Sequence, residues 1–236
     1  MGFSYSKISL YERCPKKYYF KYIEKLQVPF EDKPVFEKGR FIHHIIEHYP
    51  ELPEFNFKFK EVEDKKIDYL NQINEFITKN KKAKFFLDQN VLLHREKEFF
   101  LNEKLEEVKT REESIINGII DYVGHYNDNI ILVDWKTGMS QKYASLNQLK
   151  FYSLYIFNNF PSINKLKVFL FFVEQDEYIY EELTRADYKK TEEKYLKLIH
   201  TILDDTEYKC KKAEDCMRCE YYENCKPFKI NLTKEK

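Results

Sequence analysis

Residues 118–136 read GIIDYVGHYNDNIILVDWK, and this stretch decides the fold that we expect. Two runs rich in Ile, Val and Tyr flank the turn-forming residues 127–129, a pattern that predicts two short β-strands joined by a turn. Asp121 interrupts the first apolar run and Asp134 closes the second. A carboxylate among apolar neighbours is costly unless another group compensates its charge, so both acids need a partner.

Lys136 follows Asp134 by two residues, so the period of a strand places both side chains on one face. Two acids and a lysine on one sheet face suit a divalent cation, a bound water and a phosphate group. A purely structural alternative is an ion pair between Asp134 and Lys136, with Asp121 as a capping residue. The rest of the chain has to decide between these interpretations.

The composition indicates a folded chain without a general preference for polyanions. The 43% of hydrophobic residues supports a core, and 40 basic residues balance 40 acidic ones. This balance argues against a generic polyanion binder but leaves room for a local basic groove. There is no run of about 18 apolar residues and no charged leader before an apolar run. We therefore expect no membrane span, no secretory signal and a cytoplasmic location.

The cysteines indicate a metal site near the end of the chain. Cys216, Cys219 and Cys225 form a C-x2-C-x5-C pattern in a polar tail, and the thiolates of a C-x2-C pair can reach one metal. Without a secretory signal, this pattern favours metal ligation over disulfides. Either Cys14 or Cys210 could supply a fourth ligand, and Cys14 would join the two ends of the chain. Zinc on the same ligands and free buried thiols are the alternatives.

Residues 4–25 predict two short helices, the first capped by Ser4 or Ser6 and the second begun by Pro15. Six basic and two acidic residues lie between positions 7 and 25. Four aromatic residues are interleaved with them: Tyr18, Tyr19, Phe20 and Tyr22. Such residues would contact phosphates and stack on bases, or would form a solvated helix with an aromatic core stripe.

The remaining periodicity predicts an α/β fold. We expect helices over 35–49, 61–80, 145–159 and 184–204, a charged hairpin over 94–111, and strands over 165–174 and 178–183. Pro50 and Pro53 end the first of these helices, and Gly138 turns the chain after Lys136. The run over 165–174 is apolar enough to be buried on both faces. A central mixed sheet would then hold the acids and the lysine between flanking helices.

Four motifs, in this order, resemble the RecB-type branch of the PD-(D/E)xK nuclease superfamily. They are Gly39-x-x-x-His43, Gly118-x-x-Asp121, Asp134-Trp135-Lys136 and Gln148-x-x-x-Tyr152. This branch includes the nuclease domains of bacterial recombination helicase-nucleases and CRISPR-associated adaptation nucleases. Cys14-Pro15 and the three late cysteines are similar to an iron-sulfur subgroup of the branch, so the resemblance spans 4–228. Ile120 stands where the strict family pattern has proline.

The resemblance implies a restriction-endonuclease-like fold, with a central mixed sheet flanked by helices. It also implies that Mg²⁺ or Mn²⁺ is bound by His43, Asp121, Asp134 and the backbone carbonyl of Trp135. Lys136 would orient or activate the attacking water and offset the charge of the transition state. Gln148 and Tyr152, one helical turn apart, would border the site and contact DNA or support Lys136.

The cysteine motif implies, by the same resemblance, a structural [4Fe-4S] cluster that joins the chain ends. Its ligands would be Cys14, Cys216, Cys219 and Cys225, with zinc as the alternative metal; Cys210 does not fit the pattern. We expect a single nuclease domain over 1–236. Residues 1–30 and 205–228 would form the cluster region, 35–204 the nuclease core, and about 50–90 a helical insertion.

The function implied by the resemblance is that of a metal-dependent deoxyribonuclease. We expect an exonuclease that acts on single-stranded DNA ends in DNA repair, recombination or CRISPR adaptation, with a helicase or a CRISPR adaptation protein as partner. The sequence has no P-loop, so the chain would be a stand-alone nuclease or the nuclease subunit of a larger machine. The alternative is a non-catalytic DNA-binding or assembly subunit that retains the fold and the cluster.

One further motif lies on the helix predicted over 35–49. His44-Ile-Ile-Glu47-His48 matches H-x-x-E-H, an inverted zinc-peptidase signature with two histidine ligands and a glutamate base. However, His43 rather than His44 lies four residues after Gly39, as the nuclease motif requires. The sequence therefore favours His43 as the functional histidine and disfavours a peptidase.

Overall fold

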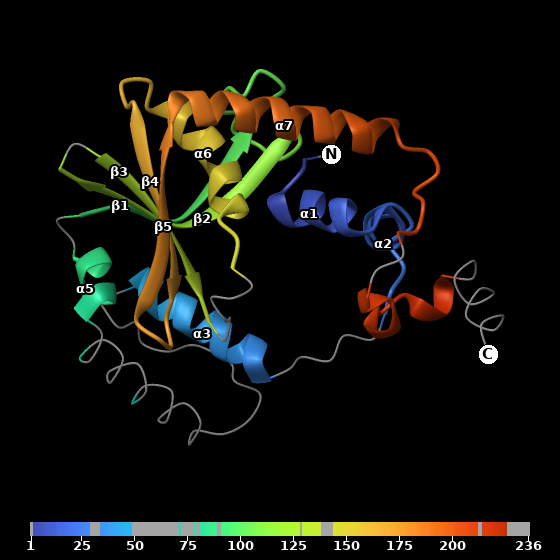
Figure 1. Cartoon of the computed structure of the whole chain (residues 1–236), viewed down its shortest axis with the longest axis horizontal. Coiled ribbons are helices and arrows are strands. Elements are labelled where there is room, and N and C mark those ends of the chain that lie inside the picture. The colour runs from blue at the N-terminus through green and yellow to red at the C-terminus, as the bar shows by residue number, and fades with distance from the viewer. Residues whose placement is uncertain are drawn as a thin grey trace.

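The computed structural model describes residues 2–28, 34–48, 71, 78, 81–88, 91–127, 129–137, 144–211 and 214–225. Within these residues the chain forms a five-stranded sheet in the order β1-β2-β3-β4-β5 (Figure 1). The strands are β1 (Leu92–Leu101), β2 (Ile116–Tyr126), β3 (Asn129–Lys136), β4 (Lys165–Phe172) and β5 (Glu177–Thr184). β3 and β4 are parallel and the other pairs are antiparallel, which confirms the mixed sheet.

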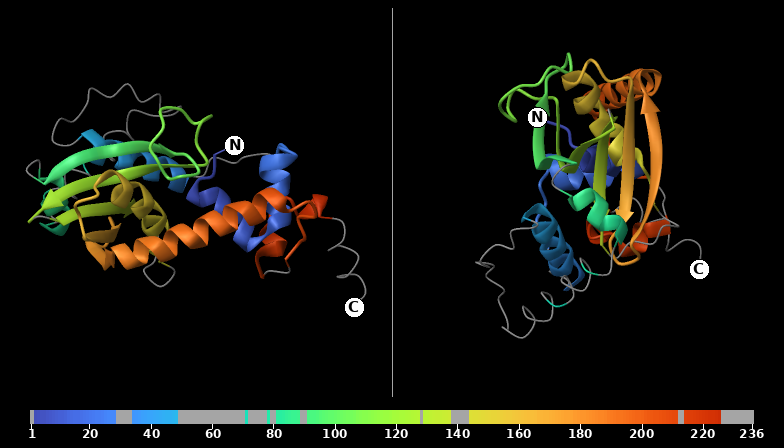
Figure 2. Two further views of the ribbon diagram at one scale, coloured as in Figure 1. Left: turned by 90° about the horizontal axis from the view of Figure 1, so that it is seen from above. Right: turned by 90° about the vertical axis from the view of Figure 1, so that its left-hand side faces the viewer.

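Helices cover both faces of the sheet. On one face lie α1 (Tyr5–Arg13), α6 (Asn147–Asn159) and α7 (Arg185–Asp204), and on the other lie α3 (Pro34–His48) and α5 (Lys81–Leu87). Alternate residues of β3 divide between the faces, because Leu132 packs in the first core and Val133 and Trp135 in the second. Figure 2 shows the strands between α3 and α7. The α/β class predicted from the sequence is thereby confirmed.

The connection from β3 to β4 places α6 beside the end of β3. These two strands are parallel, so the chain must cross over between them, and α6 forms that crossover. Thr184 and Asp187 form a capping box at the start of α7. Arg185 donates to the carbonyls of Phe157 and Phe160 at the end of α6. These contacts fasten the C-terminal end of α6 to the start of α7, while the N-terminal end of α6 contacts Lys136 through Gln148.

Of the other predicted elements, the structure confirms some and differs from others. The helices and strands expected over 35–49, 145–159, 165–174, 178–183 and 184–204 are confirmed within two residues at each end. The hairpin over 94–111 forms only in part. The chain turns back after Leu101 and an isolated antiparallel bridge joins Leu101 to Glu107, but β1 forms its ladder with β2. The charged residues of this segment belong to strand β1, whose side chains Phe99 and Leu101 point into the core and are buried. The helix over 61–80, its connector and the turn at Gly138 lie outside the described residues, apart from helical positions 71 and 78.

The N-terminal segment folds as α1, then α2 (Pro15–Tyr18) and a π-helical turn (Tyr19–Ile23). Tyr18 and Phe20 are buried, so the structure favours the core-stripe alternative for these two aromatic side chains. The ring of Tyr19 contacts that of Tyr208. No helix in the described part of the chain is long and apolar enough to cross a membrane.

Candidate active site

The candidate site lies where β2 and β3 part. Their backbone ladder runs from Tyr126 opposite Asn129 to Tyr122 opposite Val133, and it ends there in the described strands. At the next position, Oδ2 of Asp121 accepts a hydrogen bond of 2.9 Å from the backbone N–H of Trp135. The carboxyl group of Asp121, whose side chain is only 13% exposed, thus replaces a backbone acceptor between the two strands.

Glu96 on β1 lies opposite Asp121. The neighbouring pairs fix this register, because Arg95 lies opposite Tyr122 and Lys97 opposite Ile120. The φ angle of Glu96 is 44°, a left-handed conformation that costs a non-glycine residue about 1–3 kcal/mol. Sequence analysis missed Glu96, since it stands in a run of charged residues that is typical of a solvated strand. A sequence pattern does not reveal a left-handed residue in the middle of a strand.

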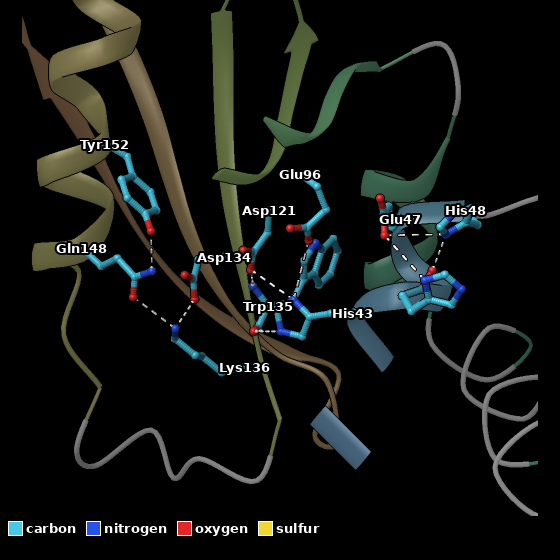
Figure 3. A network of polar contacts seen from close by, with 11 residues as sticks. His43, Glu47, His48, Glu96, Asp121, Asp134, Trp135, Lys136, Gln148 and Tyr152 are labelled. Atoms are coloured by element: carbon cyan, nitrogen blue, oxygen red, sulfur yellow. Dashed lines mark hydrogen bonds and ion pairs between the residues drawn. The ribbon is translucent and has the colours of Figure 1, made fainter. Parts of the chain in front are cut away.

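His43 reaches this point from α3. Its Nε2 lies 2.9 Å from the carbonyl oxygen of Trp135, which can only accept, so Nε2 is the donor. Its Nδ1 lies 3.7 Å from Oδ2 of Asp121 and 3.9 Å from Oε1 of Glu96 (Figure 3). Ligand atoms of His43, Glu96 and Asp121 all lie within 4.8 Å of one another. Metal-ligating histidines commonly donate their other ring N–H to a carbonyl, as His43 does here.

Lys136 is held on the opposite side of the site. Its Nζ lies 2.6 Å from Oδ2 of Asp134, which is 1% exposed, and donates to Oε1 of Gln148 at 3.2 Å. The amide of Gln148 in turn donates to the hydroxyl of Tyr152 at 2.9 Å. The ion pair considered in the sequence analysis therefore exists, but as one part of a network that α6 completes (Figure 3).

Burial shifts the acid-base properties of this cluster. Burial raises the pKa of Asp121 to about 7, and the charge of Asp134 adds to the rise, while His43 and the N–H of Trp135 oppose it. Burial also raises the pKa of Asp134, against the effect of Lys136. For His43, burial lowers the pKa, but Glu96, Asp121 and Asp134 together outweigh it and the pKa is raised. Without a metal the cluster therefore retains protons near neutral pH.

Two glycines allow the elements to approach each other. A Cβ atom on Gly118 would lie 2.8 Å from ring carbons of both Phe99 and Tyr152. A Cβ atom on Gly39 would lie 3.0 Å from Oγ1 of Thr137, just beyond β3. The glycines of the first two sequence motifs thus bring Tyr152 against β2 and α3 against the end of β3. In each motif, the glycine allows a close approach within four residues of a predicted site residue, His43 or Asp121.

The donor set fits a hard or borderline divalent cation. Carboxylate oxygens from Glu96 and Asp121 and one imidazole nitrogen are ligands that Mg²⁺ and Mn²⁺ accept. The predicted roles of Asp134 and of the Trp135 carbonyl as direct ligands remain predictions. In the structure Asp134 contacts Lys136, and the carbonyl accepts from His43.

The five cysteines surround one hollow at the other end of the molecule. Cys14 precedes α2, and the others come from the segment after α7: Cys210, Cys216, Cys219 and Cys225. None forms a disulfide, and the Sγ atoms of Cys210 and Cys225 are 3.5 Å apart. Burial raises the pKa of Cys210 to about 12 and also raises that of Cys219, so without a metal these two thiols are protonated. The structure thus brings the four predicted ligands together and adds Cys210, which the sequence pattern had set aside.

Contacts between the chain ends support this hollow. Lys17 on α2 forms an ion pair of 2.6 Å with Glu220, and Nζ of Lys211 donates to the carbonyl of Glu12. The rings of Phe20 and Tyr221 pack with their centres 5.6 Å apart. Figure 1 shows the C-terminal segment, in red, beside α2.

Comparisons with known proteins give one family match and similar solved structures. The sequence profile of the PD-(D/E)XK nuclease superfamily matches residues 2–226, nearly the whole chain. No curated protein sequence gives a significant match. A solved structure described as a candidate exonuclease from Eubacterium rectale has a TM-score of 0.56 at 12% identity, covering 93% of this chain and 87% of its own. The crystal structure of SSO0001 gives a TM-score of 0.42 at 16% identity, over 92% of this chain and 84% of that one.

The raised pKa of Asp121 predicts an unusual pH dependence of stability. The carboxyl has its ordinary pKa of 3.8 in the unfolded chain and a pKa of about 7 in the folded one. The folded state therefore holds its proton more tightly, and stability falls as pH rises from about 4 through 7. In EDTA, Asp121→Asn should remove this contribution and raise the melting temperature at pH 8 by about 2–4 °C or more.

Asp187→Asn is the matched control, because its shift has the opposite sign. The hydroxyl and backbone N–H of Thr184 hold the pKa of Asp187 below its usual value, so its contribution is complete throughout pH 5–8. This variant should melt lower than wild type by an equal amount at pH 6 and pH 8. Thermal unfolding in EDTA that is independent of pH for wild type, or a destabilised Asp121→Asn at pH 8, would contradict the account.

Proposed function

The chain belongs to the PD-(D/E)XK nuclease superfamily, and we propose that it hydrolyses DNA phosphodiester bonds with a divalent metal held by His43, Glu96 and Asp121. One observation carries this proposal. Three side chains that could hold a metal gather close to a lysine that is itself held by Asp134 and Gln148 (Figure 3). A non-catalytic subunit would gain nothing from placing Glu96, Asp121 and Asp134 close together, because each negative charge raises the free energy of keeping the others charged away from water.

Each residue of the cluster has a distinct task in this proposal. When bound, Mg²⁺ or Mn²⁺ supplies positive charge to the phosphate and lowers the pKa of a water molecule. Glu96 and Asp121 offer oxygens, and His43 offers Nδ1, whose direction is fixed by the bond from Nε2 to the Trp135 carbonyl. This bond makes the carbonyl an orienting partner of His43. Direct ligation by Asp134 or by the carbonyl remains an expectation from the family resemblance.

Lys136 acts on the reacting groups. Its ammonium carries three protons, and contacts to Asp134 and Gln148 use two of them. The third can be donated to the attacking water or to a phosphate oxygen, where the positive charge offsets the negative charge that develops during attack. Gln148 and Tyr152 are positioning residues, because they reach the reaction through the ammonium group.

The substrate that we propose is the end of single-stranded DNA. The resemblance to RecB-type nucleases supports DNA, and the exonuclease description of the E. rectale protein is consistent with attack at an end. Stacking by Tyr18 and Phe20 does not contribute, because both rings are buried. DNA repair, recombination or CRISPR adaptation is the setting that we propose, with a helicase or a CRISPR adaptation protein delivering the unpaired strand.

The cysteine hollow is proposed to hold a [4Fe-4S] cluster on Cys14, Cys216, Cys219 and Cys225. A set of four cysteine ligands suits either such a cluster or a structural zinc ion. The cluster would fasten the C-terminal segment to α2, where the ion pair between Lys17 and Glu220 already joins them. Cys210 is then a neighbouring thiol that binds no iron.

The nuclease is tested with end-labelled linear and circular single-stranded DNA in Mn²⁺, Mg²⁺ or EDTA. We expect the linear strand to be degraded only with metal and the circle to survive. Lys136→Ala should slow cleavage by about 10²–10³-fold or more, while DNA binding and folding persist. Lys165→Ala, which removes an exposed lysine paired with Glu182, should cleave as wild type does.

Glu96 provides the sharpest part of this test, because β1 supplies its own control. Glu96→Gln should require at least about tenfold more Mn²⁺ for half-maximal cleavage, since it removes a charged ligand. Glu98→Gln, on the same strand but exposed and paired with Arg111, should not. A metal-loaded protein that binds DNA and never cuts would favour the assembly subunit, and cleavage of the circle would show internal attack.

The cluster is tested by metal analysis after anaerobic purification. Wild type should be brown and contain about four iron atoms per chain, as expected for a [4Fe-4S] cluster. Cys14→Ser should lose iron, whereas Cys210→Ser should keep it. A colourless wild-type protein with one zinc ion would overturn the iron-sulfur assignment, and loss of iron in Cys210→Ser alone would reassign the ligands.

A further inference from the structure

Helix α3 carries a second group of ligating side chains beyond His43. His44, Glu47 and His48 stand at positions i, i+3 and i+4, which share one face of a helix. One ligand atom from each of the three lies within 4.8 Å of the other two. Figure 3 shows Glu47 and His48 beyond His43, on the side away from Asp121. The nuclease chemistry proposed above uses none of these three residues.

We propose that His44, Glu47 and His48 form a separate binding site for Zn²⁺ or a similar borderline divalent cation. Two imidazoles and one carboxylate are ligands that zinc prefers, whereas Mg²⁺ favours oxygen ligands and its own water shell. The two imidazole rings have their centres 4.2 Å apart. Zn–N bonds of about 2.0–2.1 Å place tetrahedral ligand atoms about 3.3 Å apart, so modest side-chain rotations close the site.

Burial and spacing allow these rotations. The three side chains are 27%, 38% and 38% exposed, so an ion can reach them and a water molecule can take the fourth position. The carboxylate of Glu47 lies between the histidines, with Oε2 3.6 Å from Nδ1 of His44 and 3.7 Å from Nδ1 of His48. The negative charge of Glu47 therefore lies close to both rings, where it attracts a cation to this face of the helix.

The backbone around the group is fixed before any ion binds. Nδ1 of His48 donates to the carbonyl of His44 at 2.8 Å, which selects the tautomer whose lone pair is on Nε2. Arg95 on β1 donates to the carbonyl of Glu47 at 3.0 Å and so anchors the last turn of α3 to the sheet. An ion bound there would brace the helix that carries His43.

This interpretation differs from the peptidase suggested by the H-x-x-E-H pattern. A peptidase uses the glutamate as a base and keeps it off the metal. Here the carboxylate of Glu47 lies within 3.7 Å of a ring nitrogen of each histidine, so in our proposal it serves as a third ligand and no base is left. The site would therefore bind a metal without hydrolysing a peptide, and its existence does not depend on the nuclease activity.

The test is a titration of the chelator-treated chain, residues 1–236, with Co²⁺, a spectroscopic substitute for zinc. We expect wild type to bind one more equivalent than the double variant His44→Gln/His48→Gln, and that equivalent should lack the intense thiolate-to-cobalt bands of the cysteine site. Excess Mg²⁺ should not displace it. Glu47→Gln should weaken its binding by at least about tenfold.

Two single variants separate the sites. His200→Gln, which alters an exposed histidine on α7, should bind cobalt as wild type does. His43→Gln should lose a different equivalent, the one for which Mg²⁺ competes. Circular dichroism checks that each variant folds. If the double variant folds and binds as many equivalents as wild type, the proposed zinc site does not exist.

Discussion

The candidate site depends on the burial of two carboxylates at the point where β2 and β3 part. Asp121 continues the ladder with its side chain, and Asp134 is almost completely buried one strand away. Two such charges in an apolar sheet are tolerated only if positive charge or protons compensate them. Lys136 compensates Asp134 directly, and His43 together with retained protons compensates Asp121 in the metal-free protein. A divalent cation is the natural replacement for those protons.

The surrounding helices hold the positively charged groups next to the two carboxylates. α6 crosses over between parallel strands and holds the ammonium of Lys136 through Gln148, while α3 approaches closely enough for His43 to bond a backbone carbonyl. Gly39 and Gly118 provide the space for the two approaches. The same helix α3 is anchored to β1 near its C-terminal end, where His44, Glu47 and His48 form a second group of possible ligands. One arrangement of helices on a sheet therefore serves two chemically different sets of donors.

Sequence patterns predicted the parts of this arrangement that follow from local periodicity. The two-residue strand period placed Lys136 beside Asp134, and helical spacing placed Gln148 beside Tyr152. Sequence patterns did not predict Glu96, because its position in the site depends on the pairing of β1 with a distant strand and on a left-handed backbone within β1. The cysteine pattern left Cys14 and Cys210 as alternatives for a fourth ligand, because only the packing of the C-terminal segment shows that both thiols lie with the other three. What local patterns could not reveal was long-range register.

The most direct test of this account is anomalous diffraction from crystals of the protein soaked in Mn²⁺. The account predicts one strong manganese peak bonded to His43 Nδ1, Glu96 and Asp121, with the ammonium of Lys136 on the adjacent side. The peak should be absent from crystals of Asp121→Asn grown and soaked in the same way. A wild-type crystal with no peak there, or with manganese only at other residues, would contradict the claim that the buried carboxylates exist to bind a metal.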